Sequence, residues 1–129
     1  MKILFHENEL NYRGTSIALY DYADFNERYL GNESIIVYNK TLPTNHPLGI
    51  EKFEKRFKVI DYSDFKEVDS IIKNNNIDLF YAIKNGFYDD IETKECKTVV
   101  HSVFKYFEPH GDVYAYVSEW LSEEMTQGQ

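Results

Sequence analysis

The opening of the chain, Lys2-Ile-Leu-Phe-His6 followed by Asn11-Tyr-Arg-Gly-Thr-Ser16, decides the predicted fold. Its consecutive apolar residues indicate a strand covered on both faces, which is typical of a parallel sheet. A loop ending in Gly14 then leads into an amphipathic helix that is expected to begin at Thr15 or Ser16. The backbone N–H groups of such a first turn carry partial positive charge and bind anions or hydroxyl groups. The glycine signal is weak alone, because the full G-x-G-x-x-G pattern is absent.

Strands and helices alternate along the rest of the chain. Further strands are predicted at residues 34–38, 58–61, 77–83, 97–101 and 113–117, and helices at 15–29, 48–56, 64–74 and 119–125. This alternation predicts an α/β fold: a Rossmann-like, doubly wound parallel sheet of about six strands with helices on both faces. Right-handed crossovers favour the strand order 3-2-1-4-5-6.

Two local patterns make this prediction more specific. In the third helix, Asp64 and Glu67 have the spacing of a capping box. In the first helix, acidic residues are expected to point outward, and the residues expected to face the core recur at helical spacing. These core residues are Ala18, Tyr22, Phe25 and Tyr29.

Composition limits the class of protein. The 129 residues are enough for one domain, and no second domain fits. A net charge of −8, from 14 basic and 22 acidic residues, argues against a nucleic-acid partner. No apolar run is long enough for a transmembrane helix, and no signal peptide is indicated. The single cysteine, Cys96, fits a reducing compartment, so the chain is expected to be cytoplasmic, with peripheral membrane association left open.

Ligands of such sheets bind outside the carboxyl ends of the strands, where the strand order reverses. That reversal is expected between the first and fourth strands, so the loops after strands one, four and five should line one crevice. The residues brought to this crevice are His6, Glu7, Glu9, Asn11, Arg13, Gly14, Thr15, Lys84, Asn85, Gly86, His101, Glu108 and His110. The two cations in this set, Arg13 and Lys84, together with the helix start could hold a phosphate or a sugar hydroxyl.

Each of these residues also has a purely structural interpretation. Arg13 and Lys84 could be solvated surface charges, and Gly14 could relieve crowding where strand meets helix. His101 could hydrogen-bond a sugar hydroxyl or move a proton there, or it could be a packed residue. His6 and His101 lie on strands that flank strand four, but no Cys/His or H-E-x-x-H spacing supports a metal, and no metal site is expected.

Four stretches of the chain are similar to one family: Met1-Lys-Ile-Leu-Phe-His6, Arg13-Gly-Thr-Ser-Ile-Ala-Leu19, Val99-Val-His101 and Tyr116-Val-Ser-Glu-Trp-Leu121. Together they resemble the N-terminal half of a GT-B glycosyltransferase, similar to the retaining nucleotide-sugar transferases of bacteria and large DNA viruses. The resemblance implies two Rossmann-like domains, of which the N-terminal one mainly holds the acceptor. The family's usual glycine pair is a single Gly14 in this chain.

The resemblance also implies roles for individual residues. Arg13, Gly14 and Thr15 would lie near the donor phosphates and the acceptor, and His101 would be the catalytic residue near the reacting sugar. The predicted crevice, rather than the resemblance, adds Lys84 and Asn85 to the expected substrate-binding residues. It also makes the loop that carries Glu108 and His110 a possible acceptor loop.

The expected function is the acceptor side of a glycosyltransferase that moves a sugar from a nucleotide-sugar to an acceptor hydroxyl. The C-terminal donor-binding domain is expected to be absent, so this chain alone is expected to be inactive. Its expected partners are a sugar or glycan acceptor and a donor-binding domain, with the nucleotide-sugar as co-substrate and no cofactor. The alternatives are a stand-alone flavodoxin- or receiver-like module that binds a small ligand without catalysis, and a structural or partner-binding domain.

Overall fold

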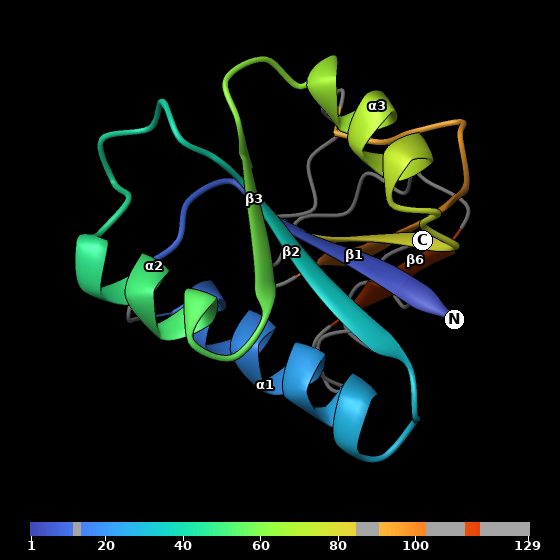
Figure 1. Ribbon diagram of the computed structural model, residues 1–129, viewed down its shortest axis with the longest axis horizontal. Helices are drawn as coiled ribbons and strands as arrows, with labels where there is room; N and C mark the ends of the chain where they lie inside the picture. The colour runs from blue at the N-terminus through green and yellow to red at the C-terminus, as the bar shows by residue number, and fades with distance from the viewer. Residues whose placement is uncertain (12–13, 85–90, 103–112, 117–129) are drawn as a thin grey trace, which may run out of the picture.

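A six-stranded parallel sheet forms the centre of the computed structural model, which describes residues 1–11, 14–84, 91–102 and 113–116 (Figure 1). Its strands are β1 Lys2–Glu7, β2 Glu33–Asn39, β3 Lys58–Tyr62, β4 Leu79–Lys84, β5 Lys97–Ser102 and β6 Val113–Tyr116. Every neighbouring pair is parallel, in the order β3-β2-β1-β4-β5-β6. The predicted fold class and strand order are confirmed.

Helices cover both faces of this sheet. In the described part of the chain they are α1 Thr15–Arg28, α2 Pro47–Glu54 and α3 Glu67–Asn74. α1 and α2 lie on one face and α3 on the other (Figure 1). None of these helices combines the length and the hydropathy that a membrane span requires. The helix predicted at residues 119–125 lies outside the described residues.

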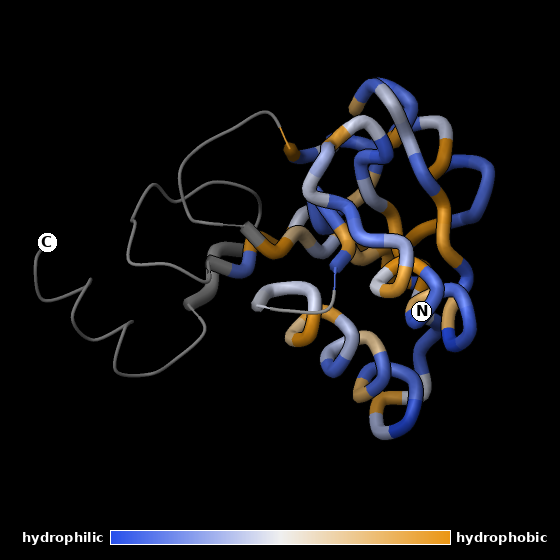
Figure 2. The backbone as a smooth tube through the Cα atoms, turned by 90° about the vertical axis from the view of Figure 1, so that its left-hand side faces the viewer, coloured by the Kyte–Doolittle hydropathy of each residue, from blue (hydrophilic) through white to orange (hydrophobic). Residues whose placement is uncertain are grey.

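Alternating side chains of the strands build two hydrophobic cores. Ile3 and Phe5 of β1 belong to the core beneath α1 and α2, which we call the α1-side core. Leu4, between them, packs with Val68 and Ile72 of α3 in the α3-side core. Figure 2 shows hydrophobic residues concentrated along the strands, whereas the helices alternate between hydrophobic and hydrophilic residues. β1 is therefore covered on both faces, as its apolar run predicted.

The buried face of α1 differs from the predicted one. Phe25 and Tyr29, expected in the core, are 52% and 74% exposed. The buried residues are Ser16, Leu19, Ala23 and Asn26. Two of these are polar, and their hydrogen bonds make burial tolerable: Asn26 Nδ2, for example, donates to Ser34 Oγ at 2.9 Å. Because the prediction counted apolar residues alone, it placed the buried stripe about one residue away.

Two acidic residues of α1 also lie elsewhere than predicted. Asp24 and Glu27 were expected to point away from the protein, but both contact Arg56, just after α2. Arg56 Nη2 lies 3.0 Å from Asp24 Oδ1, and Arg56 Nη1 lies 2.5 Å from Glu27 Oε1. These ion pairs join α1 to the end of α2.

The start of α3 uses the predicted residues in a different arrangement. Asp64 Oδ1 accepts a hydrogen bond from the Lys66 N–H at 3.0 Å, and Glu67 Oε2 accepts one from the Ser63 N–H at 2.8 Å. Asp64 and Glu67 therefore do not form a capping box with each other, because a turn separates Asp64 from the helix. Both carboxylates still satisfy N–H groups near the helix start, where negative charge is favourable.

The connection from β1 to α1 is fixed against the connection from β2 to α2. Asn45 Oδ1 accepts a hydrogen bond from the Leu10 N–H at 2.8 Å, while Asn45 Nδ2 donates to Asn39 O at 2.7 Å. Gly49 of α2 lies so close to Asn11 that an added Cβ would be 2.5 Å from Asn11 backbone carbons. The two connections thus form one packed unit, which determines where α1 begins.

Candidate functional site

The carboxyl edge of the sheet carries two buried titratable residues on one face. Alternation along β1 puts Glu7 on the same side as Ile3 and Phe5, which belong to the α1-side core. His101 of β5 lies beside Ile83, also of the α1-side core, in the β4–β5 register. Glu7 and His101 therefore lie on the α1 face of strands two positions apart, a backbone separation of roughly 10 Å.

His6 points to the opposite face of the sheet. Its Nε2 lies 2.6 Å from Tyr62 Oη, and its ring contacts Tyr62, Phe65 and Phe80 of the α3-side core. His6 and His101 are thus separated by the sheet and cannot share a metal. Within the described ranges, no group of three or more His, Cys, Asp or Glu residues could hold a metal ion.

Glu7 is the most unusual group at this edge. The residue is 6% exposed, and its Oε2 is buried without a hydrogen-bond partner among the described residues, whereas Oε1 accepts from the Asn8 N–H at 3.2 Å. Burial raises the pKa of Glu7 to about 7, and the neighbouring charge of Glu9 raises it further, against the lowering effect of hydrogen bonds from the Thr15 hydroxyl and the Asn8 N–H. Near neutral pH this carboxyl can accept a proton or release one.

Gly14 and Thr15 form the start of α1, next to Glu7. Gly14 is the N-cap residue with φ 56° and ψ −128°, and no side chain caps the helix. A Cβ at Gly14 would meet no described atom within 4 Å, so positive φ rather than crowding requires glycine here. Among the described residues, nothing crowds Gly14. Space beside a glycine backbone at a helix start is suited to the close approach of a ligand.

Ser16 fixes the loop that precedes this helix start. Its Oγ accepts a hydrogen bond from the Asn11 N–H at 3.1 Å and donates one to Glu9 O at 3.2 Å. The residue is buried, so both bonds are shielded from water. Glu9 and Asn11 are thereby held over the first turn of α1.

His101 is a buried, neutral imidazole. It is 6% exposed, and burial lowers its pKa. Its Nδ1 lies 2.5 Å from Tyr81 Oη, and its ring contacts the rings of Tyr22 and Tyr81. Burial raises the pKa of Tyr81 to about 12, so the tyrosine hydroxyl keeps its proton near neutral pH. The hydroxyl donates to Nδ1 when the His101 proton is on Nε2, and it accepts from Nδ1–H in the other tautomer. This packing agrees with the structural interpretation of His101, and its catalytic role stays a prediction.

Replacing Tyr81 with phenylalanine is expected to lower the free energy of unfolding by about 1–2 kcal/mol, because Nδ1 of His101 loses its buried hydrogen-bond partner. Long-range nitrogen–proton NMR spectra of the parent and the variant show which ring nitrogen of His101 carries the proton and whether the loss of Tyr81 Oη changes it. Tyr22→Phe is the matched control, since its ring contacts His101 but its hydroxyl makes no hydrogen bond within the described part of the chain. Equal effects of the two substitutions would contradict the assigned hydrogen bond.

The remaining predicted site residues divide into two groups. Thr15 begins α1 and Lys84 ends β4, both at the carboxyl edge of the sheet. The others lie outside the described residues: Arg13, Asn85, Glu108 and His110. Glu7 was one of many crevice residues in the sequence and was not singled out. The signal that could have found it is the alternation Ile3, Phe5, Glu7, which places a carboxylate on the buried side of a strand end.

Comparisons with known proteins assign no relative to the chain. No protein-family model matches it, and neither a curated protein nor a solved structure does so. The proposals below therefore depend on the geometry of the carboxyl edge and on the family resemblance of the sequence.

Proposed function

We propose that the chain is the acceptor-side domain of a glycosyltransferase and that Glu7 accepts a hydrogen bond from the acceptor hydroxyl. The observation that carries this proposal is the buried carboxyl of Glu7, whose Oε2 has no partner in the described ranges, beside the first turn of α1. A buried polar atom without a partner is costly, and a ligand that supplies a donor removes that cost.

The charges around α1's first turn favour a hydroxyl over a phosphate. Glu7 and Glu9 both carry carboxyl groups there, and the charge of Glu9 acts on Glu7. A phosphate would be repelled by these groups, whereas a sugar hydroxyl donates to a carboxylate oxygen and accepts from backbone N–H groups. This supports binding of the acceptor, rather than of the donor phosphates, at Glu7.

The pKa of Glu7 suits it to the proton transfer that such a reaction needs. Glycosyl transfer to a hydroxyl forms a bond from the hydroxyl oxygen to the sugar carbon and releases the hydroxyl proton, while the nucleotide leaves with the electron pair of the broken bond. A carboxylate with a pKa of about 7 accepts that proton near neutral pH. His101, whose Nδ1 is bonded to Tyr81 Oη, would present its Nε2 to a hydroxyl of the same sugar.

The flavodoxin- or receiver-like alternative has less support. Those folds have the strand order 2-1-3-4-5, whereas this sheet has the order β3-β2-β1-β4-β5-β6. In addition, Asp61 on β3, a candidate for the receiver's phosphorylated residue, is half exposed and pairs with Lys40 at 3.8 Å.

Transfer also needs a donor-binding wall opposite this edge. The reacting atoms must be held about 3–3.5 Å apart, and such proximity contributes roughly 7–11 kcal/mol to the barrier reduction. We therefore propose that a separate donor-binding domain supplies the nucleotide-sugar and that the chain alone does not catalyse transfer.

Titration of the isotope-labelled chain with neutral sugars tests the proposal. Glucose, galactose, mannose and N-acetylglucosamine are the probes, and at least one is expected to shift the backbone amide signals of Glu7, Gly14 and Thr15 saturably. Glu7→Ala should abolish these shifts, whereas Glu54→Gln, on the exposed side of α2, should leave them unchanged. Sugar transfer by the chain alone, or binding of flavin mononucleotide instead of any sugar at these amides, would refute the proposal.

A further inference from the structure

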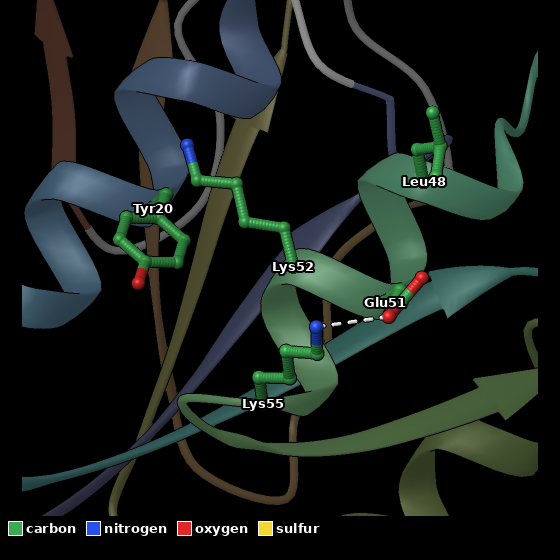
Figure 3. A pocket seen from close by; sticks show the side chains of 5 residues that line it. All are labelled: Tyr20, Leu48, Glu51, Lys52 and Lys55. Carbon is green, nitrogen blue, oxygen red and sulfur yellow. Dashed lines mark ion pairs between the residues drawn. The ribbon is translucent and has the colours of Figure 1, made fainter.

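A concave surface lies between α1 and α2. This pocket has a volume of about 440 Å³ and is lined by Tyr20 of α1, by Leu48, Glu51 and Lys52 of α2, and by Lys55 at the end of α2 (Figure 3). It involves neither Glu7 nor His101, so it is distinct from the candidate site at the carboxyl edge. We call it the α1–α2 pocket.

The position of Lys52 in this pocket is set by a tyrosine ring. The Lys52 Nζ lies 4.4 Å from the centroid of Tyr20, a cation–π contact. The Tyr20 ring is itself held by edge contacts with Phe53 and Phe57, at centroid distances of 5.4 and 5.3 Å. Figure 3 shows the Lys52 side chain extending from α2 towards Tyr20. The Lys52 ammonium group therefore lies against the Tyr20 ring, whose position is fixed by Phe53 and Phe57.

Lys52 differs from its neighbours in having no acidic partner within the described ranges. Lys55 pairs with Glu51 at 2.9 Å, and Arg56 pairs with Asp24 and Glu27. The pairing of Glu51 with Lys55 leaves the positive charge of Lys52 uncompensated inside the pocket. In a chain with a net charge of −8, a cation of this kind is a local site for a negative group.

The rest of the pocket offers apolar contact. Leu48 is 64% exposed at its rim, and the ring of Tyr20 forms part of its wall. An apolar chain of a ligand would cover Leu48 and remove it from water, which is favourable in proportion to the area buried. The pocket thus favours a negative group at Lys52 and an apolar group at Leu48.

We infer that the α1–α2 pocket binds a small ligand in which an anionic group, held by Lys52, is joined to a short apolar chain that contacts Leu48. This inference does not depend on the proposed function at Glu7. A soluble phosphorylated or carboxylated metabolite and the headgroup region of an acidic lipid both have this chemistry.

Titration of the isotope-labelled chain with hexyl phosphate, hexanol and inorganic phosphate tests the inference. Hexyl phosphate is expected to shift the amide signals of Leu48 and Lys52 saturably, and to bind more tightly than either hexanol or inorganic phosphate. Lys52→Gln should weaken hexyl phosphate binding about fivefold, as expected for an exposed charge pair, and Lys52→Arg should retain it. Lys66→Gln, at an exposed lysine beside α3, is the matched control and should change nothing.

Vesicles distinguish the two sources of the ligand. Sedimentation with vesicles of phosphatidylcholine and phosphatidylglycerol, but not of phosphatidylcholine alone, with loss in Lys52→Gln, would assign the site to a lipid headgroup. Binding of hexyl phosphate without vesicle binding would assign it to a soluble anion. Equal binding of hexanol and hexyl phosphate, equal effects of Lys52→Gln and Lys66→Gln, or no binding of any probe would overturn the inference.

Discussion

Replacing Glu7 with glutamine is expected to stabilise the fold at pH 8 by about 3 kcal/mol. The pKa of Glu7 rises from 4.5 to about 7 on folding, mainly because the carboxyl is buried. Each unit of difference corresponds to about 1.4 kcal/mol between the two protonation states. Glutamine removes the cost of burying the ionised carboxylate and keeps a similar shape.

The pH dependence of this effect has a definite sign. Between pH 4.5 and 7 the folded state binds more protons at Glu7 than the unfolded state does, so stability falls as pH rises through this window. The contribution of Glu7 is complete below pH 4.5 and is lost above pH 7. Urea unfolding of the parent and of Glu7→Gln should therefore give similar free energies at pH 4.5 and the largest difference at pH 8.

Glu54→Gln controls for the loss of a carboxylate as such, since Glu54 is exposed on α2. It should change stability by no more than about 0.5 kcal/mol at either pH. A Glu7→Gln variant that is no more stable than the parent at pH 8 would mean that the carboxylate is compensated in the folded state. A carboxylate that reduces stability is instead expected where it serves a ligand, as proposed for Glu7.

Replacing Gly49 with alanine is expected to lower the free energy of unfolding by at least about 2 kcal/mol. At an exposed position inside a helix, the same change from glycine to alanine would raise the free energy of unfolding by roughly 1 kcal/mol. At Gly49 the new Cβ would lie 2.5 Å from two Asn11 backbone carbons and 2.6 Å from its carbonyl oxygen. A backbone cannot yield as a flexible side chain does, so α2 must move away from the connection between β1 and α1.

Gly31→Ala is the matched control, because an added Cβ there meets no described atom within 4 Å. Its φ of 70° makes alanine strained, at a cost of about 1–2 kcal/mol. Thermal or urea unfolding of both variants measures the difference. Gly49→Ala should also shift the amide signals of Asn11 and Gly14, whereas Gly31→Ala should not. A Gly49→Ala protein as stable as the parent would contradict the close approach.

The elements that could be predicted were those with a strong local signal. The run Ile3-Leu4-Phe5 predicted a doubly covered strand, and strand–helix alternation predicted the sheet order. The face of α1 could not be predicted, because Ser16 and Asn26 are buried through hydrogen bonds that apolar counting ignores. The close approach of Gly49 to Asn11 could not be predicted either, because the two residues are far apart in the sequence.

At the carboxyl edge, the positions of Gly14 and Thr15 could be predicted, whereas the environment of Glu7 could not. The carboxyl edge and the glycine at the start of α1 follow from the sequence pattern, and the structure has Gly14 and Thr15 there. The environment of Glu7 could not be predicted, because a carboxylate is rarely found inside a protein and its burial depends on how α1 covers the sheet. The hydrogen bond of His101 likewise depends on Tyr81, which sits on another strand.

The bonds of Asn45 have a consequence for any redesign of the connection between β1 and α1. The Asn45 amide bonds both to Leu10, between β1 and α1, and to Asn39, at the end of β2. Changing residues 8–11 alone would therefore leave Asn45 fitted to the original loop. Libraries that diversify positions 45 and 49 together with that loop should yield more folded clones. The conformation of one connection is thus set partly by the other.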